Sequence, residues 1–166
     1  MELYQALVLC AVIYLVMMAR HYFFALPSDN TIYIEDQKVT AIRNDDRVTI
    51  YEHPPPATYH GESLSEVRLH RCFYSRVFHC SAPDNMQIQI LIFPPDNSRY
   101  LYPNSHLFRL SQTSQINMLE PQVDKYPLFK KAEYIEIPII GQQSFVIPRG
   151  WWVFIDSPSH ILTKTF

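Results

Sequence analysis

Several side chains in this sequence could bind a metal ion or transfer protons. Six histidines and two carboxylates have the required groups: His53, His60, His70, His79, His106 and His160, with Asp84 and Asp156. Metal sites need their ligands at short, characteristic spacings, such as Cys-x-x-Cys in zinc proteins. None of these residues has such a spacing, so for each histidine we favour a surface or hydrogen-bonded core position.

Ser81 lies two residues after His79 and could act as a nucleophile with His79 as its base. Nucleophilic catalysis needs a third group that orients the base, and in many hydrolases the serine sits on a sharp strand-turn-helix elbow. The sequence around these two residues offers neither feature. It therefore does not favour nucleophilic catalysis.

The aromatic stretch FVIPRGWWVFI (145–155) could stack a ligand or pack a protein core. Side chains alternate along a strand, so we expect one tryptophan to face the interior and the other to face outward or lie at the rim. An exposed tryptophan beside an arginine would suit a protein partner, because both residues are favoured at interfaces. We predict core packing as the main role, with a partner contact at Arg149, Trp151 and Trp152.

Short strands dominate the chain beyond residue 26. β-branched and aromatic runs predict strands at 31–35, 38–42, 47–52, 65–78, 86–93, 133–140, 143–148, 151–155 and 160–166. Three prolines make 53–63 a rigid connector, and the proline-marked segment 120–134 predicts a loop with room for one helical turn. Many short strands at regular spacing are typical of an all-β sandwich or barrel.

Residues 3–19 form an almost unbroken apolar run, interrupted only by Gln5. A bilayer core of about 30 Å requires roughly 20 helical residues, with about 17 as the lower limit. A cleaved signal peptide usually begins with positive charge and ends in small residues, but this chain begins Met1-Glu2 and has Phe23 where a small residue is wanted. A buried core helix would need more surrounding protein than the chain offers. The run therefore predicts a membrane anchor.

We accordingly divide the chain into a transmembrane anchor at 1–26 and a β-barrel domain at 27–166. Positive charges follow the apolar run and none precedes it; they are Arg20, Lys38, Arg43 and Arg47. Because positive residues favour the cytoplasmic side of a membrane, we expect the C-terminal domain on that side, which would be the capsid-facing side in a virion.

Composition argues against a nucleic-acid partner and leaves open whether two of the cysteines form a disulfide. The formal net charge is −2 and no run of Lys or Arg occurs, so nucleic-acid binding, which needs clustered positive charge, is not expected. Cys72 and Cys80 could pair if their strands are adjacent, whereas Cys10 is most simply a small apolar residue of the anchor. The three cysteines do not make a disulfide framework.

From Phe93 to the end, the sequence resembles the cupin-like JmjC family, in particular the hydroxylase branch that includes the asparaginyl hydroxylase of hypoxia-inducible factor. The matching motifs are FPPDNSRYLYP (93–103), SQIN (114–117), YPLFKKAEYIEIPI (126–139), FVIPRGWW (145–152) and HILTKTF (160–166). With a weaker match at HCSAPDN, the resemblance covers about residues 79–166. It implies a double-stranded β-helix, a jelly-roll barrel, which agrees with the strand count.

Enzymes that this chain resembles hold Fe(II) with two histidines and one carboxylate. In the family the first ligand begins a His-x-Asp (or Glu) motif six residues before an Asn, and the resemblance places it at His79, six residues before Asn85. It places the carboxylate at Ser81 and the distal histidine, directly after the Trp pair, at Val153. Serine is a poor iron ligand and valine has no donor atom, so two of the three ligands are missing and no metal is expected.

The co-substrate site of the family is also incomplete. In the branch mentioned, a lysine that binds the 2-oxoglutarate carboxylate comes from a hairpin before Phe-Pro-Pro. Here NMQIQILIF (85–93) is too short for that hairpin and contains no basic residue. A dicarboxylate in a half-buried pocket needs a compensating cation. We therefore expect no cofactor.

The leading hypothesis is a non-enzymatic, membrane-anchored jelly-roll scaffold or interaction protein, with the lipid membrane contacted through residues 3–19. By analogy with small anchored proteins of large DNA viruses, we predict a virion membrane or minor capsid protein whose partners are other structural proteins, such as the capsid. Three alternatives remain: an Fe(II)/2-oxoglutarate oxygenase with non-standard ligands, a barrel that binds a small ligand without redox chemistry, and a viral envelope protein that acts in entry.

Overall fold

The structure is a computed structural model of the chain. It describes residues 2–23, 31–36, 47–54, 57–61, 67–83, 85–104 and 111–165. The strand predicted at 38–42 and the candidate ligands Asp84 and His106 lie outside the described residues.

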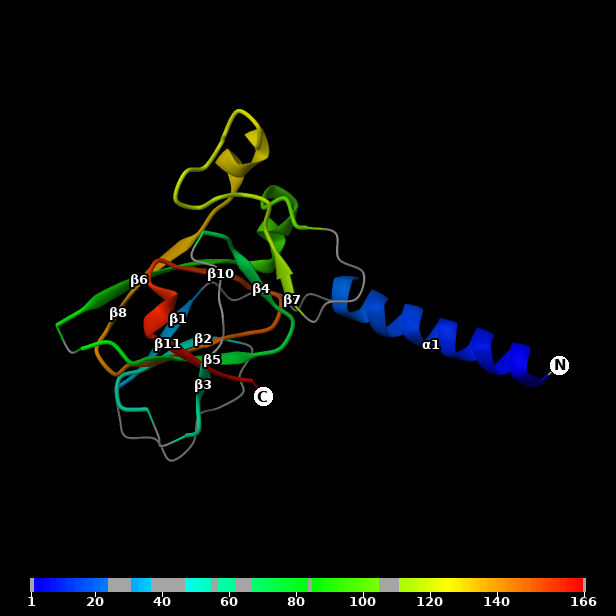
Figure 1. The fold of residues 1–166 in the computed structure, drawn as a ribbon, viewed down its shortest axis with the longest axis horizontal. Coiled ribbons are helices and arrows are strands. Elements are labelled where there is room, and N and C mark those ends of the chain that lie inside the picture. The colour runs from blue at the N-terminus through cyan, green and yellow to red at the C-terminus, as the bar shows by residue number, and fades with distance from the viewer. Residues whose placement is uncertain are drawn as a thin grey trace.

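The described strands form a sandwich of two β-sheets (Figure 1). The larger sheet has the order β1 (Ile32–Glu35), β2 (Val48–Tyr51), β9 (Ser144–Ile147), β5 (Arg76–Cys80), β11 (Ile161–Thr165) and β3 (His60–Gly61). The smaller sheet has the order β7 (Ser111–Thr113), β4 (His70–Cys72), β10 (Trp152–Ile155), β6 (Gln87–Phe93) and β8 (Ile135–Ile140). Apart from the parallel pair β1–β2, neighbouring strands are antiparallel. The all-β prediction is therefore confirmed at the level of a two-sheet sandwich.

The main core lies between the sheets because alternate residues of each strand point inward. Every second residue of β6 is buried, starting at Ile88, and β8 shows the same alternation at Ile137 and Ile139. These side chains pack against Phe78, Phe145 and Val153 from other strands in one apolar cluster. The alternation that identified the strands in the sequence is thus the alternation that builds the core.

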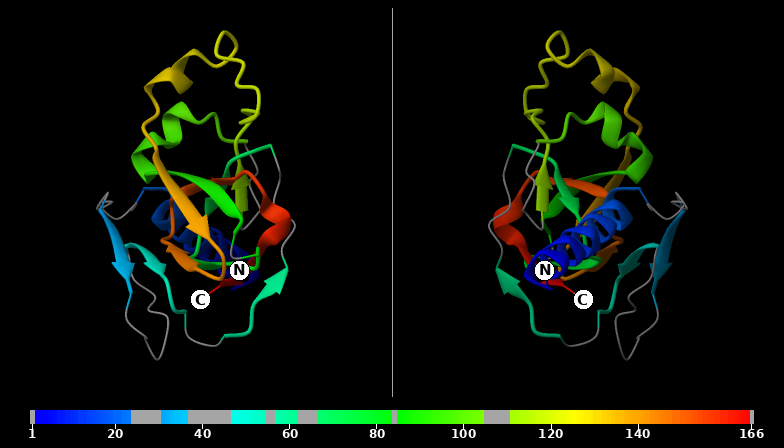
Figure 2. Two further views of the ribbon diagram at one scale, coloured as in Figure 1. Left: turned by 90° about the vertical axis from the view of Figure 1, so that its left-hand side faces the viewer. Right: turned by 90° about the vertical axis from the view of Figure 1, so that its right-hand side faces the viewer.

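A second apolar cluster covers the outer face of the smaller sheet. It consists of Leu69, Phe93, Leu101, Trp152 and Phe154, with Met118, Phe129 and Ala132 partly buried against it. Its covering layer is the excursion, the described segments 94–104 and 114–134 on either side of β7, which projects from one side of the sandwich in Figure 2. The excursion contains two short 3-10 helices, η1 (Pro95–Tyr100) and η2 (Pro127–Lys131). The second is the helical turn predicted within 120–134.

Two predictions about strands need correction. The run 65–78 was predicted as one strand, but it divides into β4 and the first part of β5, which belong to different sheets. The connector 53–63 also contributes a short strand, since His60 pairs with Thr163 of β11.

Cys80 is a free, buried thiol, so a disulfide with Cys72 does not form. Its strand is not adjacent to β4, which was the condition for pairing.

The N-terminal segment forms the helix α1 (Glu2–Phe23), which extends away from the sandwich in Figure 1. Each residue from Gln5 to Met17 is exposed, and the apolar side chains include Leu7, Leu9 and Leu15 at 62%, 59% and 65% exposure. Among the described residues, no helix has the length and apolarity that a membrane crossing requires. The helix at 3–19 is as predicted, whereas the transmembrane span is not supported by this result.

Candidate functional site

Val153, the position that the resemblance assigns to the distal iron ligand, lies deep in the main core. It is 1% exposed on β10 and packs in the apolar cluster between the sheets. Its neighbours across the smaller sheet are Ile92 on β6 and His70 on β4. An isopropyl group has no lone pair for a metal ion, so this position contributes only apolar packing.

His79, the predicted first ligand, lies in the other sheet and points the other way. Its neighbours on β5, Phe78 and Cys80, belong to the main core, so alternation turns His79 to the outer face. There its Nδ1 lies 2.8 Å from Ser144 Oγ and its ring stacks on Tyr59, with a centroid distance of 4.7 Å. His79 and Val153 therefore do not approach a common site.

Ser81, the predicted carboxylate position, is exposed at the end of β5. Its hydroxyl donates a hydrogen bond of 2.9 Å to the backbone carbonyl of His160. The structure thus brings none of the three predicted metal positions together, and Ser81 does not form a nucleophile pair with His79. His79 and Ser81 lie at or after β5, which pairs with β9 and β11 in the larger sheet. Val153 lies on β10 in the smaller sheet, so these positions are apart.

The structure offers a second candidate for the first-ligand position, one strand earlier in the chain. Between β4 and β6 the structure has an additional strand, β5, so residues 76–93 form two strands, which lie in different sheets and are not a paired hairpin. The strand that pairs with β10 is β4. There the expected His-x-Asp pattern reads His70-Arg71-Cys72. Sequence reasoning could have found His70 from the length of the run 65–78, which exceeds one ordinary strand.

His70 is the histidine that lies beside Val153. The two residues are direct partners in the antiparallel pair β4–β10, and His70 is also opposite Thr113 of β7. Opposed residues in such a pair have their side chains on the same face, with Cβ atoms about 5 Å apart. Even with His70 in place, the described residues contain no group of three His, Cys, Asp or Glu side chains that could hold a metal ion. These residues do not fit the Fe(II) centre of the family.

The cluster around His79 is a buried hydrogen-bonded arrangement. Ser144 is fully buried, and its Oγ lies between His79 Nδ1 and the Tyr59 hydroxyl, which is 3.4 Å away. Burial lowers the pKa of His79 because it disfavours the imidazolium, and a hydrogen bond with Gln142 partly opposes this shift. A serine with no access to solvent cannot attack a substrate. The three side chains instead attach the segment before β3 to the larger sheet.

Both tryptophans are buried, which corrects the predicted partner contact. Trp151, 2% exposed, packs in the main core, whereas Trp152, fully buried, packs in the outer cluster. The Trp152 indole N–H donates to Ser98 Oγ at 2.9 Å and so holds η1 against the sheet. Neither indole can reach a partner, because Trp151 lies between the sheets and the excursion covers Trp152. Arg149 alone of the three is exposed.

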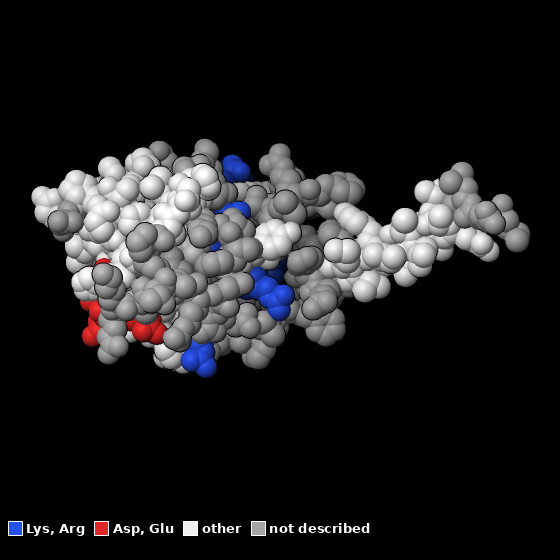
Figure 3. Space-filling view, turned by 90° about the horizontal axis from the view of Figure 1, so that it is seen from below, with Lys and Arg blue, Asp and Glu red and all other residues white. Residues whose placement is uncertain are grey.

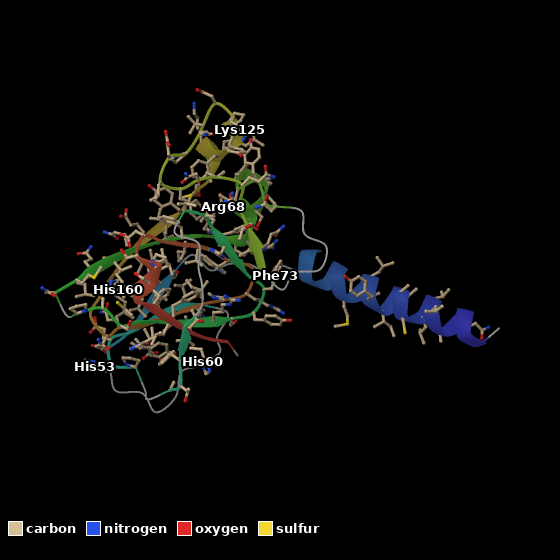
Figure 4. The ribbon with its side chains drawn as sticks, viewed as in Figure 1. His53, His60, Arg68, Phe73, Lys125 and His160 are labelled. Atoms are coloured by element: carbon tan, nitrogen blue, oxygen red, sulfur yellow. The ribbon has the colours of Figure 1, made fainter. Side chains whose placement is uncertain are left out.

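The other candidate ligands do not converge. Figure 4 shows His53, His60 and His160 at separate places on the sandwich. Asp156 is exposed, and its Oδ1 accepts a hydrogen bond of 3.2 Å from the backbone N–H of Gln89. The thiol of Cys80 is buried, which raises its pKa, although a hydrogen bond from the backbone of Ala82 partly counteracts the effect. This thiol is therefore not a reactive group.

Comparison with known proteins finds partial relatives. The chain is 31% identical over 67 residues to HSPB1-associated protein 1 of Homo sapiens, covering 40% of this chain and 14% of that protein. It is 39% identical over 72 residues to JmjC domain-containing protein D of Dictyostelium discoideum, covering 42% and 16%. It is 32% identical over 97 residues to tRNA wybutosine-synthesizing protein 5 of Mus musculus, covering 48% and 29%.

These matches correspond to less than a third of each relative's length. No family model matches the chain. The relatives are JmjC, cupin-like proteins, so the resemblance first seen in the motifs is confirmed. Over part of its length, this chain is homologous to the cupin-like JmjC proteins.

Proposed function

We propose that this chain is a non-enzymatic binding module with a cupin-like double-stranded β-helix, in which the iron site of the JmjC oxygenases has been replaced by apolar core. The observation that carries the proposal is the burial of Val153 among apolar side chains at the position of the distal ligand. Iron chemistry at this site would need a nitrogen or oxygen donor there. Valine supplies packing in its place.

The lining of the main core supports the same conclusion for the co-substrate. Among the described residues, Arg71 is the one buried residue that carries a charge. A dicarboxylate such as 2-oxoglutarate needs a cation and hydrogen-bond donors when it leaves water. The buried arginine of β4, Arg71, lies with Trp152 and Phe73 on the outer face, where its guanidinium is 5.9 Å and 5.5 Å from those rings. It does not supply charge to the core.

The module is attached, in this proposal, to a lipid membrane through α1. A helix that is apolar on every side is stable when apolar surroundings cover it, yet Leu9, Ile13 and Val16 are 59%, 50% and 61% exposed. Acyl chains would cover all sides of such a helix at once, which a flat protein surface would not. The place in a virion that we predicted stays a prediction, since the relatives named above are proteins of cellular organisms.

The test of the non-enzymatic assignment uses the full chain in mild detergent. We expect it to bind no stoichiometric Fe(II) under anaerobic conditions, by elemental analysis after desalting, and to release no succinate from 2-oxoglutarate. Stoichiometric iron accompanied by turnover would establish the oxygenase alternative and end this proposal. If the wild type does bind iron, a His79→Ala variant tests whether His79 is a ligand. We expect it to leave the iron content unchanged.

A further inference from the structure

Among the described residues, the two ends of the sandwich carry side chains of opposite charge. At one end, β5 begins at Arg76, which is paired with the last residue of β9, Ile147. Arg149 follows β9 by two residues, and Arg47 directly precedes β2, which runs antiparallel to β9. These three arginines therefore lie at one end, which we call the basic end. Arg47 and Arg149 are exposed and Arg76 is half-buried.

The opposite end carries carboxylates. Glu35 pairs with the last residue of β2, Tyr51, and Glu52 follows that residue directly. Asp156 follows the last residue of β10. In Figure 3, most Lys and Arg side chains on one face lie toward α1 and the Asp and Glu side chains lie farther from it, with one blue group near the red ones at the lower edge. The basic residues come together because antiparallel pairing brings the start of β2, the end of β9 and the start of β5 to one end of the larger sheet.

The basic end is also the end that faces α1. The turn between β4 and β5 contains Phe73 and Tyr74, and Figure 4 shows Phe73 at the edge of the sandwich beside α1. Tyr74 is 38% exposed. Aromatic side chains of this kind are enriched at the boundary between acyl chains and headgroups. Exposed arginines, the exposed ring of Tyr74 and an exposed apolar helix thus lie on one side of the molecule.

The excursion does not add to this charge separation. Its described residues carry equal numbers of both signs: Asp96, Glu120, Asp124 and Glu133 with Arg99, Lys125, Lys130 and Lys131. Lys125 lies in Figure 4 at the tip of the excursion, away from α1. Substitution of lysines on the excursion can therefore serve as a control, because it removes the same charge at a different place on the molecule.

We propose that the basic end docks on anionic lipid headgroups, so that the sandwich stands with this end against the membrane that holds α1. The inference rests on the proposed attachment through α1 and adds the lipid class and the orientation. Arginine suits the partner because its guanidinium binds phosphate oxygens in a bidentate manner. The carboxylates at the far end are repelled by the same surface, which favours this orientation over its reverse.

The test measures co-flotation of the full chain with vesicles of phosphatidylcholine alone and with about 30% phosphatidylserine. Each basic side chain close to an anionic surface raises binding about fivefold, so Arg47→Gln with Arg149→Gln should weaken binding to the anionic vesicles about 30-fold. Binding to neutral vesicles should not change. High salt should remove the difference between wild type and variant, because it screens charges at the surface.

The control is Lys130→Gln with Lys131→Gln, which changes net charge equally on the excursion and should leave vesicle binding unchanged. Equal loss in both double variants would overturn the docking surface and indicate a response to net charge alone. Equal binding of the wild type to both vesicles would also overturn it while leaving the attachment through α1 intact. Absence of any vesicle binding would instead overturn the attachment. Stronger binding to a short DNA duplex than to anionic vesicles, lost in the arginine variant, would replace the lipid by a nucleic acid.

Discussion

At the residue scale, the most informative position is Val153. The motif around it was found in the sequence because two tryptophans in succession are rare, and the residue after them has no donor atom. The partner histidine was not found correctly, because a count along the chain cannot show which strand pairs with β10. The register places His70 and not His79 beside Val153.

This assignment predicts that Val153→Gln or Val153→Ala will not bind metal, whereas Val153→His will bind Co(II) together with His70. Opposed residues on antiparallel strands are close enough for two imidazoles to share one ion. The second change His70→Ala should abolish the cobalt absorption spectrum, and His79→Ala should leave it unchanged. The reverse result would return the ligand position to His79. Burial of the larger polar ring should lower the free energy of unfolding by about 1–3 kcal/mol.

His79 predicts a pH dependence of stability. Its pKa in the folded chain lies below the ordinary value of 6.5, so the unfolded chain takes up the proton first as the pH falls. The contribution of His79 to folding is therefore complete above that value and decreases as the pH falls below it. In urea titrations at about pH 7.5 and 5.5, His79→Gln should lose less stability on acidification than wild type.

The comparison with His79→Gln isolates the contribution of His79, because the two proteins differ at that residue alone. At neutral pH the same variant should be less stable by about 1–2 kcal/mol, since it loses the hydrogen bond to Ser144 and the stacking on Tyr59. An identical pH dependence for both proteins would contradict the lowered pKa.

At the element scale, the excursion depends on Trp152. Because this indole packs in the outer cluster and donates to Ser98, Trp152→Phe should lower the free energy of unfolding by about 1–3 kcal/mol. It should also loosen the excursion locally, with faster tryptic cleavage at Lys125 and Lys130. Trp151→Phe is the matched control, because it removes the same group from the core between the sheets. Tryptic cleavage of Trp151→Phe should follow global unfolding only. Equal local cleavage in both variants would contradict the role of Trp152 in holding the excursion.

Sequence reasoning identified most strands but not their partners. The runs at 86–93 and 133–140 became β6 and β8 because alternation between apolar and polar residues directly reports one buried face. The turn at 73–75 was missed because it contains neither glycine nor proline, and aromatic residues continue through it. The covering of β10 on both faces was also missed. A fully apolar strand indicates two buried faces but does not show which segment covers the second.

At the scale of the whole molecule, α1 leaves a large apolar surface without cover. A surface of this kind marks an interaction site. In the absence of lipid, the apolar side chains of α1 can be buried against α1 of other copies of the chain. We expect the full chain to form oligomers or aggregates after removal of detergent, measured by analytical ultracentrifugation.

Three substitutions on α1 should prevent this association. Leu9, Val12 and Val16 are 59%, 50% and 61% exposed, and burial of each such side chain contributes roughly 1.5–3 kcal/mol. Changing all three to Gln should therefore give a monomer in buffer and reduce vesicle binding by at least about a thousandfold. The sandwich should keep its unfolding midpoint in urea, because no core residue changes. If the variant still associates, the sandwich itself contains the interface, and α1 would no longer account for how the molecule assembles.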